Sequence, residues 1–381
     1  MDVQGAEPNY KLVRVAFRAD ASVQIGTGHV MRCLALADEL RERGAQCDFI
    51  CRSHAGNLLE LIDCHGHNAI ALPAPEEGHS HSHGAAYAAW LGTDWAMDAE
   101  QTRRVLSGKS VDWLVVDHYS LDHQWEKALR LSCQHLMVID DLANRTHESD
   151  LLLDQNLGRN LVDYGGLLAP RTRTLIGPQY ALLRREFSQW RRYSLQRRAR
   201  PKLKSLLISM GGVDKDNTTG QVLQVLKGCD LTPELRITVL MGPSAPWVRQ
   251  VQAQATQMPW PTQVLVGSDN VARLMADSDL AIGASGSTSW ERCCLGVPAI
   301  QIVLADNQKS IATALEKEGA AIVVKSDLLQ LTLPGLLSQI ADETTLQAMT
   351  HRASCLADGD GAAKVAALLT NDFYEYHSAL Q

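Results

Sequence analysis

Segments with the pattern of buried strands alternate with segments of helical periodicity almost throughout this chain of 381 residues. This alternation predicts an α/β fold with parallel sheets covered by helices. In the first half we expect strands near residues 12–18, 46–51, 68–72, 112–117, 135–140 and 173–176, and helices near 29–43, 54–64, 97–107 and 121–131. In the second half we expect strands at 206–209, 235–240, 263–266, 280–282 and 299–303. The chain is thus predicted to form two doubly wound, Rossmann-like domains that face a central cleft.

A charged helical stretch over residues 180–200, with Pro201 beyond it, separates the two alternating series. We interpret its arginines as the solvated face of a linker helix rather than as a nucleic-acid patch, since aromatic residues scarcely interleave with them. The Pro- and Gly-containing stretch 73–95 is expected to be a long loop. The expected division is a disordered lead-in (1–10), a first domain (11–183), a linker (184–201) and a second domain (202–381) whose last helix can pack back on the first.

Composition narrows the classes of function. The formal net charge is -7, which does not suit a nucleic-acid-binding protein. No apolar run reaches the roughly 18–20 residues of a membrane span. The N-terminus lacks the basic and apolar regions of a signal peptide. The nine cysteines include no CxxC pair and are expected to be reduced. We therefore expect a cytoplasmic protein, a monomer without nucleic-acid or membrane partners.

The first chemistry-bearing motif, Gly26-Thr27-Gly28-His29, stands between an expected strand and an expected helix. Glycine allows unusual backbone angles and close approach of a ligand. His29 falls in the first turn of the helix, where exposed backbone N–H groups carry partial positive charge. That field disfavours the imidazolium form, so His29 is expected to be neutral and able to accept a proton. A Gly-rich turn with a capping histidine is an equally good interpretation of this motif alone.

A second motif follows the expected strand 280–282 and leads into a helix. Its small residues and free N–H groups at a helix N-terminus suit a diphosphate. Glu291, about one turn into the helix, can accept two hydrogen bonds from a ribose diol. The pair Thr288 and Glu291 also fits a capping box, and the sequence does not separate these two interpretations. The expected phosphate-binding residues of this turn are Ser285, Gly286, Ser287 and Thr288.

Further loops follow other expected strands. Gly211 and Gly212 can bring their backbone to the same phosphates, while Asn307 and Gln308 can bond sugar, phosphate or amide groups or simply cap a helix. Asp117 and Tyr119 end a strand at the same sheet edge as His29, so they are candidates for the cleft. The histidines at 79, 81 and 83 have no nearby carboxylate or Cys partners at a known metal-ligand spacing, so we expect no metal. We expect no cofactor either.

Several of these motifs, in order from about residue 14 to 310, together resemble the family of UDP-sugar hydrolases of pseudaminic acid biosynthesis, which is similar in fold to the GT-B glycosyltransferases. The resemblance rests on the following segments: 17–22, 25–33, 116–119, 139–141, 154–156, 175–184, 209–212 and 305–308. The chain departs from the family mainly in the His-rich stretch near 79–83 and in the N-terminal lead-in.

The resemblance implies hydrolysis of UDP-2,4-diacetamido-2,4,6-trideoxy-β-L-altropyranose to the free sugar and UDP. It makes His29 the residue that activates water, with Tyr119 beside it, Glu291 on the ribose and Asn307 on the ligand. Asp20 is placed with the catalytic residues, and Arg18 and Gly28 with the substrate-binding ones. Attack by water from the face opposite UDP predicts inversion at the anomeric carbon.

Two other functions share parts of this pattern. A GT-B inverting glycosyltransferase would use every UDP feature and differ only in its acceptor, but the first half shows no convincing basic, apolar patch for docking on a membrane. A non-catalytic nucleotide-sugar-binding protein would leave a histidine prepared as a base without a purpose. Hydrolysis is therefore the preferred expectation.

Overall fold

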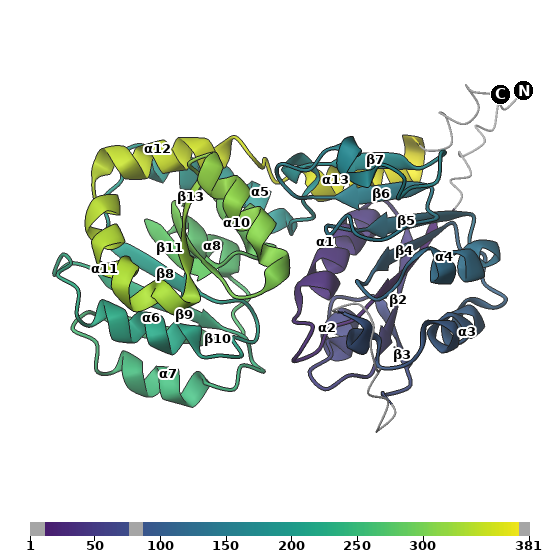
Figure 1. The fold of residues 1–381 in the computed structure, drawn as a ribbon, viewed down its shortest axis with the longest axis horizontal. Helices are drawn as coiled ribbons and strands as arrows, with labels where there is room; N and C mark the ends of the chain where they lie inside the picture. Colours follow the sequence, from purple (N-terminus) through teal and green to yellow (C-terminus); the bar gives the residue numbers. More distant parts are fainter. Residues whose placement is uncertain (1–11, 76–86, 373–381) are drawn as a thin grey trace, which may run out of the picture.

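The computed structural model describes residues 12–75 and 87–372 as two lobes side by side, each with a parallel sheet (Figure 1). The chain runs through the first lobe, crosses to the second, and returns to the first at its C-terminal end (Figure 1). The expected α/β architecture of two Rossmann-like domains is confirmed by this arrangement.

The first sheet has the strand order β3-β2-β1-β4-β5-β6-β7, with every neighbouring pair parallel. The order reverses between β1 and β4, and ligands of such sheets bind beyond the carboxyl ends of the strands at this point. The strands are β1 (Arg14–Ala19), β2 (Gln46–Arg52), β3 (Asn68–Leu72), β4 (Trp113–Asp117), β5 (His135–Ile139), β6 (Leu151–Asp154) and β7 (Arg173–Ile176), and the helices are α1 (Gly28–Glu42), α2 (Leu59–Cys64), α3 (Trp95–Leu106) and α4 (His123–Leu129).

The second sheet repeats the plan with the order β10-β9-β8-β11-β12-β13, again all parallel. Its reversal lies between β8 and β11. The strands are β8 (Ser205–Ser209), β9 (Arg236–Met241), β10 (Thr262–Val266), β11 (Leu280–Ala284), β12 (Ala299–Val303) and β13 (Ala321–Lys325), and the helices are α6 (Thr218–Leu226), α7 (Val248–Ala255), α8 (Val271–Ala276), α9 (Thr288–Leu295), α10 (Lys309–Lys317), α11 (Leu329–Ile340) and α12 (Glu343–Ser354).

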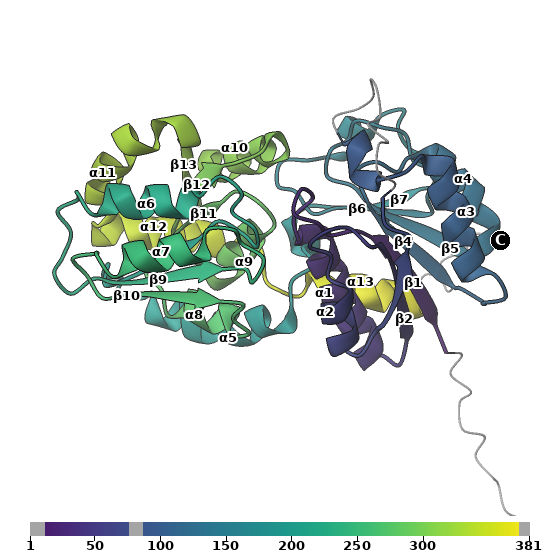
Figure 2. The same cartoon turned by 90° about the horizontal axis from the view of Figure 1, so that it is seen from below.

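Two helices tie the lobes together. Helix α5 (Arg185–Arg197) follows the first sheet in sequence but packs against α8 and α9 of the second, through Phe187 among other side chains. Helix α13 (Gly361–Ala367) follows the second sheet but lies beside α1, and its Ala362 and Val365 belong to the core under the first sheet (Figure 2). Helix α5 is therefore part of the second lobe, and helix α13, near the C-terminal end of the described chain, is part of the first lobe.

Some elements differ from the sequence expectation. The expected helix 54–64 begins only at Leu59, because Gly56 has a φ of +80° and the Asn57 carboxamide accepts from the Leu59 amide, so a turn precedes the helix. Strands β6 and β13 were not expected. The short β6 is wholly buried, and its run of three leucines lacks the alternation that identifies a half-exposed strand.

Candidate active site

His29 stands at the reversal point of the first sheet, in the first turn of α1, which directly follows the glycine turn after β1. Its Nδ1 lies 2.6 Å from Oδ1 of Asp117, the last residue of β4. β1 and β4 are neighbours in register, with Ala19 opposite Asp117, so the loops that leave their carboxyl ends meet. The sheet topology thus brings together two residues 88 positions apart in the sequence.

Arg32 fixes the Asp117 carboxylate from the same helix face as His29, since residues three apart share a face. Its Nε donates to Oδ2 of Asp117 at 2.6 Å and its Nη2 to Oδ1 at 2.6 Å. Its Nη1 donates to Oδ2 of Asp141, which follows β5, at 2.9 Å. Arg32 and Asp117 are 6% and 0% exposed, so this forked contact is held away from solvent.

The contact with Asp117 sets the tautomer of His29. Burial acts to raise the pKa of Asp117, but the Arg32 cation and His29 outweigh it and hold that pKa well below its ordinary value. An ionised carboxylate only accepts hydrogen bonds, so the proton of a neutral His29 ring must be on Nδ1. Nε2 is then the basic atom, with its lone pair directed away from Asp117.

An aromatic wall formed by Tyr87, Trp90 and Tyr119 stands next to His29. The Tyr119 ring meets the imidazole edge-on with 4.6 Å between centroids, and Trp90 stacks against Tyr119 at 5.6 Å. Tyr87 contacts both Trp90 and Tyr119, at 4.7 Å and 5.0 Å. Tyr119 comes from the turn after β4, whereas Trp90 belongs to a short helical turn, Ala88–Leu91, inside the expected long loop. This wall provides an apolar surface within reach of the His29 ring.

Three observations show that loops of the two lobes lie close together at this point. The Tyr119 hydroxyl faces the side chains of Asp141 in its own lobe and Asn307 in the other. A Cβ added to Gly28 would lie 3.6 Å from Oγ of Ser287, and one added to Gly212 would lie 2.9 Å from Oγ1 of Thr27. We call the region bounded by these loops the interdomain cleft. The loops expected to bind UDP therefore face the loop that carries His29.

The second-lobe loops lie at the reversal point of its sheet. Gly211, with a φ of +89°, follows β8, and Ser285 to Ser287 connect β11 to the start of α9 at Thr288. Ser285 is fully buried and its Oγ has no hydrogen-bond partner among the described residues. Ser287, the N-cap residue of α9, makes no capping hydrogen bond with its side chain. A helix N-terminus with these properties is suited to an anion.

Glu291 is placed one turn into α9 with its side chain 17% exposed. Its nearest cation is Arg184 of the linker, with 3.8 Å between Arg184 Nη2 and Glu291 Oε1. Burial raises the pKa of Glu291, and Arg184 acts against that rise. The capping-box interpretation of Thr288 and Glu291 does not fit the structure, because the helix starts at Thr288 itself and neither residue forms the reciprocal bonds.

Asn307 and Gln308 form a short helical turn after β12. Asn307 faces Tyr119 across the interdomain cleft. The Gln308 side chain folds back on its own loop, where its Oε1 accepts from the Leu304 amide at 3.0 Å, while its Nε2 lies beside Gly286. Gln308 thus supports the turn around Gly286, and Asn307 reaches toward the first lobe.

Arg18 and Asp20 do not face the interdomain cleft. Both side chains are completely buried, and Arg18 donates to both oxygens of Asp20, at 2.6 Å and 2.9 Å. Arg18 also donates to Asp98 of α3, and Asp98 accepts from Arg52 at the end of β2. This ion cluster ties α3 to the carboxyl ends of β1 and β2. Its buried residues have no surface on which to meet a substrate, because their charges are satisfied by one another.

Arg32 and Asp141 were missed as site residues by the sequence reasoning. Arg32 lies three residues after His29, so helical spacing alone could have placed it on the same face. Asp141 follows the strand next to β4 in the sheet, and the same edge argument that singled out Asp117 applies to it.

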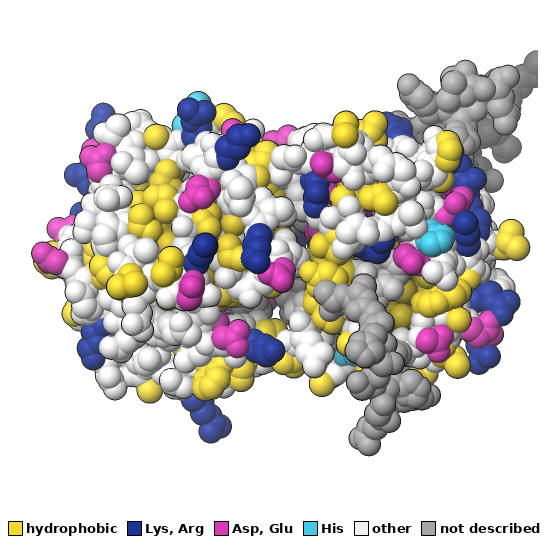
Figure 3. All heavy atoms as spheres, viewed as in Figure 1, with side chains coloured by type: hydrophobic (Ala, Val, Ile, Leu, Met, Phe, Trp, Pro, Cys, Tyr) yellow, Lys and Arg dark blue, Asp and Glu magenta, His cyan; other side chains and the backbone are white. Residues whose placement is uncertain are grey.

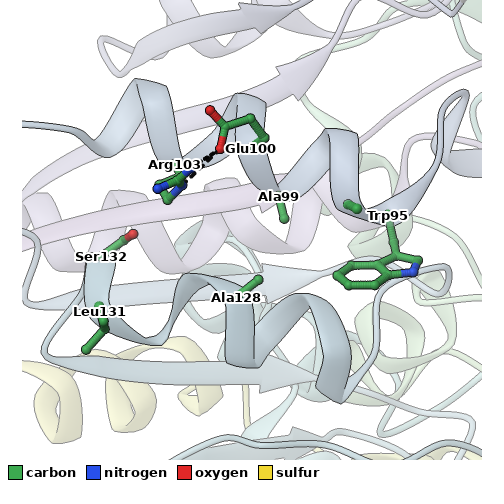
Figure 4. Close-up of a pocket in the computed structure, with 8 residues that line it drawn as sticks. Trp95, Ala99, Glu100, Arg103, Ala128, Leu131 and Ser132 are labelled. Carbon is green, nitrogen blue, oxygen red and sulfur yellow. Dashed lines mark hydrogen bonds and ion pairs between the residues drawn. The ribbon is translucent and has the colours of Figure 1, made fainter.

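Two pockets lie outside the His29 cluster. One, of about 400 Å³, lies between α3 and α4 and contains none of the expected site residues (Figure 4). The other, of about 440 Å³, opens between residues 156–163 of the first lobe and α10 of the second. In the space-filling view the surface narrows where the two lobes meet (Figure 3).

The part of the chain that the structure describes contains neither a cluster of metal-ligating side chains nor a membrane-spanning helix. There, no three His, Cys, Asp or Glu side chains gather as a metal site would require. The histidines at 79, 81 and 83 lie outside the described residues. Over residues 12–75 and 87–372, the helices are too short or too polar to cross a bilayer.

This chain is similar to known proteins in both sequence and fold. Residues 208–367 match the glycosyltransferase family 28 C-terminal domain. The UDP-2,4-diacetamido-2,4,6-trideoxy-beta-L-altropyranose hydrolase of Campylobacter jejuni is 26% identical over 313 residues, which cover 82% of this chain and all of that protein. The spore coat polysaccharide biosynthesis protein SpsG of Bacillus subtilis is 24% identical over 95% of this chain and 99% of its own length.

An uncharacterised protein of Methanocaldococcus jannaschii is 25% identical over 76% of this chain, but the match spans only 55% of that protein. Among solved structures, MurG of Acinetobacter baumannii superposes with a TM-score of 0.67 at 18% identity, covering 94% of this chain and 99% of that one. The resemblance drawn from the sequence motifs is confirmed by these matches: the chain has the GT-B fold, and its second lobe is similar to the glycosyltransferase family 28 C-terminal domain.

Proposed function

We propose that this protein hydrolyses a UDP-linked diacetamido-trideoxy sugar, UDP-2,4-diacetamido-2,4,6-trideoxy-β-L-altropyranose, to the free sugar and UDP. The observation that carries the proposal is the His29–Asp117 contact of 2.6 Å, placed opposite an uncapped helix start in the other lobe. The similarity to the Campylobacter jejuni hydrolase over its whole length supports the choice of substrate.

The proposed reaction is a single displacement at the anomeric carbon. Water attacks C1 from the face opposite UDP, Nε2 of His29 takes one of its protons, and the C1–O bond to the diphosphate breaks. General-base assistance of this kind contributes roughly 10²–10⁴-fold. Because UDP leaves as an anion, the backbone N–H groups of Gly286, Ser287 and Thr288 stabilise the charge that develops on it, whereas the Ser285 N–H already donates to the Ile302 carbonyl. Attack from the opposite face inverts the configuration of C1.

Asp117 has two roles in this proposal. It keeps the His29 proton on Nδ1, so Nε2 is available, and it balances the positive charge that the ring gains as it accepts the proton. Arg32 holds the carboxylate in place through its fork. On the nucleotide side, we propose that Glu291 accepts hydrogen bonds from the ribose diol and that Gly28, Gly211, Gly212 and Gly286 let the loops approach the diphosphate.

The decisive experiment is incubation of the purified protein with this UDP-sugar and no acceptor, followed by NMR. We expect UDP and the α-anomer of the free sugar as first products, with rates unchanged by EDTA. His29→Asn serves as the inactive control. Absence of UDP release in water would contradict hydrolysis.

An inverting glycosyltransferase is the second candidate, favoured by the family 28 match over residues 208–367. It would use the same base to deprotonate a sugar or lipid alcohol instead of water. UDP release that requires an added acceptor, with the sugar recovered on that acceptor, would favour this second function over hydrolysis.

A further inference from the structure

The His29 ring is closely surrounded by residues of its own lobe. Asp117, which is 0% exposed, closes the Nδ1 end at 2.6 Å. Tyr119 and Trp90 make T-shaped contacts with the imidazole, with 4.6 Å and 6.2 Å between ring centroids. Only 9% of the His29 side chain stays exposed. A molecule that gives its proton to Nε2 must therefore fit into a small space beside these two aromatic rings.

The turn that carries Trp90 is anchored to the rest of the first lobe. The Tyr87 carbonyl accepts from Oγ of Ser120 and from the Trp90 amide. Leu91, which is 2% exposed, packs in the hydrophobic core that α3 and α4 share with the sheet. The Trp90 ring also stacks against Tyr119 with 5.6 Å between centroids. Hydrogen bonds, core packing and ring contacts thus hold the aromatic wall in place.

The aromatic wall and the proposed base belong to the same lobe. Tyr87 and Trp90 precede α3, Tyr119 follows β4, and His29 lies at the start of α1, so all four rings are carried by the first sheet and its helices. A change in the distance between the lobes would move the second-lobe loops relative to His29 but would leave Trp90 beside it. The wall therefore limits the space next to the base in open and closed arrangements alike.

A glycosyltransferase needs more room at this point than a hydrolase does. The acceptor hydroxyl that attacks C1 brings with it the carbon chain or sugar ring to which it is attached, and that group must lie beside the base. The Trp90 indole occupies this side of His29 with an apolar surface. A polyhydroxylated acceptor pressed against it would leave hydroxyl groups without hydrogen-bond partners, which is unfavourable. A water molecule brings no such group.

We propose that Trp90 is a specificity-determining residue that excludes acceptor alcohols from the space beside His29, so that water is the nucleophile. This inference rests on the proposed function, because it assumes that His29 is the base in a displacement at C1. Rejection of the wrong nucleophile by a bulky side chain is a common source of specificity.

The substitution Trp90→Ala tests this role through the products formed in the presence of an alcohol. If the space opens, the alcohol oxygen bonds to C1, the bond between C1 and the diphosphate oxygen breaks, the alcohol proton passes to Nε2 of His29, and UDP leaves with the electron pair. NMR then measures the ratio of glycoside to free sugar, with methanol and glycerol supplied at equal concentrations. This ratio depends on neither the amount of active enzyme nor its kcat.

We expect the wild type to form free sugar almost exclusively with both alcohols. In Trp90→Ala the ratio of glyceryl glycoside to free sugar is expected to rise by about tenfold or more, since small changes in the size of a pocket change selectivity by this amount. The rise with methanol is expected to be smaller, because methanol needs less room. Trp90 is only partly buried, so the alanine variant is expected to fold. Trp90→Leu, which keeps a smaller apolar side chain, provides the same test if it does not.

Trp95→Ala is the matched control. Trp95 lies five residues further along in the same lobe, is 40% exposed, and borders the pocket between α3 and α4 (Figure 4). Its removal deletes the same side chain at a distance from the His29 cluster, and we expect the product ratios of the wild type.

Three outcomes would overturn the proposal: product ratios in Trp90→Ala within about twofold of the wild type, an equal rise in Trp95→Ala, or a wild type that readily transfers the sugar to glycerol. A wild type that hydrolyses the UDP-sugar but shows unchanged ratios in Trp90→Ala contradicts this inference alone. A wild type that releases no UDP in water contradicts the proposed hydrolysis and, with it, the role of Trp90.

Discussion

The two sides of the interdomain cleft consist of different kinds of residue. On the first-lobe side, charged side chains bond to one another: His29 to Asp117, Asp117 to Arg32, and Arg32 to Asp141. On the second-lobe side, the cleft is lined by glycines, serines and the uncapped start of α9, and Ser285 Oγ has no partner within the described part of the chain.

This difference matches what each side has to do in the proposed reaction. Moving a proton requires a base whose tautomer and orientation are fixed, and side-chain networks provide that. Holding a diphosphate requires many N–H donors and room for close approach, and small residues at a helix start provide those. Changes on the first side are therefore expected to lower kcat, and changes on the second to raise KM.

The largest effect is expected from His29. His29→Asn removes the base but keeps a polar side chain of limited size, and we expect kcat to fall by at least ~10²-fold. UDP affinity is expected to stay nearly unchanged, because the nucleotide is held by the other lobe. Assays of UDP release measure kcat, and calorimetry measures the UDP affinity. Near-normal turnover would show that His29 is not the base.

Asp117→Asn is the next most severe change. The variant no longer balances the charge of Arg32 or fixes the His29 tautomer, so we expect kcat to drop by roughly 10–10²-fold or more. Removing one partner of a buried ion pair also costs about 3–5 kcal/mol of unfolding free energy. Denaturant titration of folded protein checks the second value, and an unchanged kcat would show that Asp117 serves stability alone.

The pH dependence of stability offers a test of the same carboxylate. The pKa of Asp117 is depressed in the folded state, so its contribution is complete above the unfolded value of about 3.9 and is lost as the pH falls below it. We expect the unfolding free energy of the wild type to decline between about pH 5 and 3 more steeply than that of Asp117→Asn. Parallel curves for the two proteins would contradict the depressed pKa.

Glu291 tests the second side of the cleft. Glu291→Ala removes a proposed ribose contact that is similar in the ground and transition states, so we expect UDP binding to weaken and KM to rise by about tenfold, with a smaller change in kcat. Since Glu291 does not cap α9, the melting temperature of the Glu291→Ala protein is expected to differ little from that of the wild type. Intact UDP affinity in the calorimeter would take Glu291 out of the nucleotide site.

Much of the fold could be predicted from the sequence, because the apolar residues of strands and helices recur at regular spacings. The motif from Gly26 to His29 was correctly placed between β1 and α1, and the glycine-serine turn between β11 and α9. Strand β6 was not predicted, because a short, fully buried strand shows no alternation of apolar and polar residues. Helix α2 was overestimated because its apolar spacing does not reveal the turn at Gly56.

The candidate site was only partly accessible. The positions of residues at the sheet edge correctly predicted that Asp117 lies near His29, but they could not predict which oxygen meets which nitrogen. Arg18 and Asp20 show the limit of motif-based assignment, since being near the catalytic turn in sequence does not decide whether a side chain points into the cleft or into the ion cluster below it.

The smallest effect on UDP binding is expected from adding a methyl group at Gly28 in the cleft. A Cβ on Gly28 would make an ordinary 3.6 Å contact with Ser287 Oγ, so Gly28→Ala should fold normally. Because Gly28 is the first residue of α1, its gain in stability should be smaller than the about 1 kcal/mol of a mid-helix position. The new methyl group would nevertheless stand between the loops where we place the diphosphate, and we expect UDP affinity to fall a few-fold. Gly335→Ala in α11, where a Cβ meets nothing within 4 Å, is the control for the helix effect. Equal UDP affinities in the two variants would mean that the nucleotide does not pass between Gly28 and Ser287, and the division of labour between the two lobes would then need a different boundary.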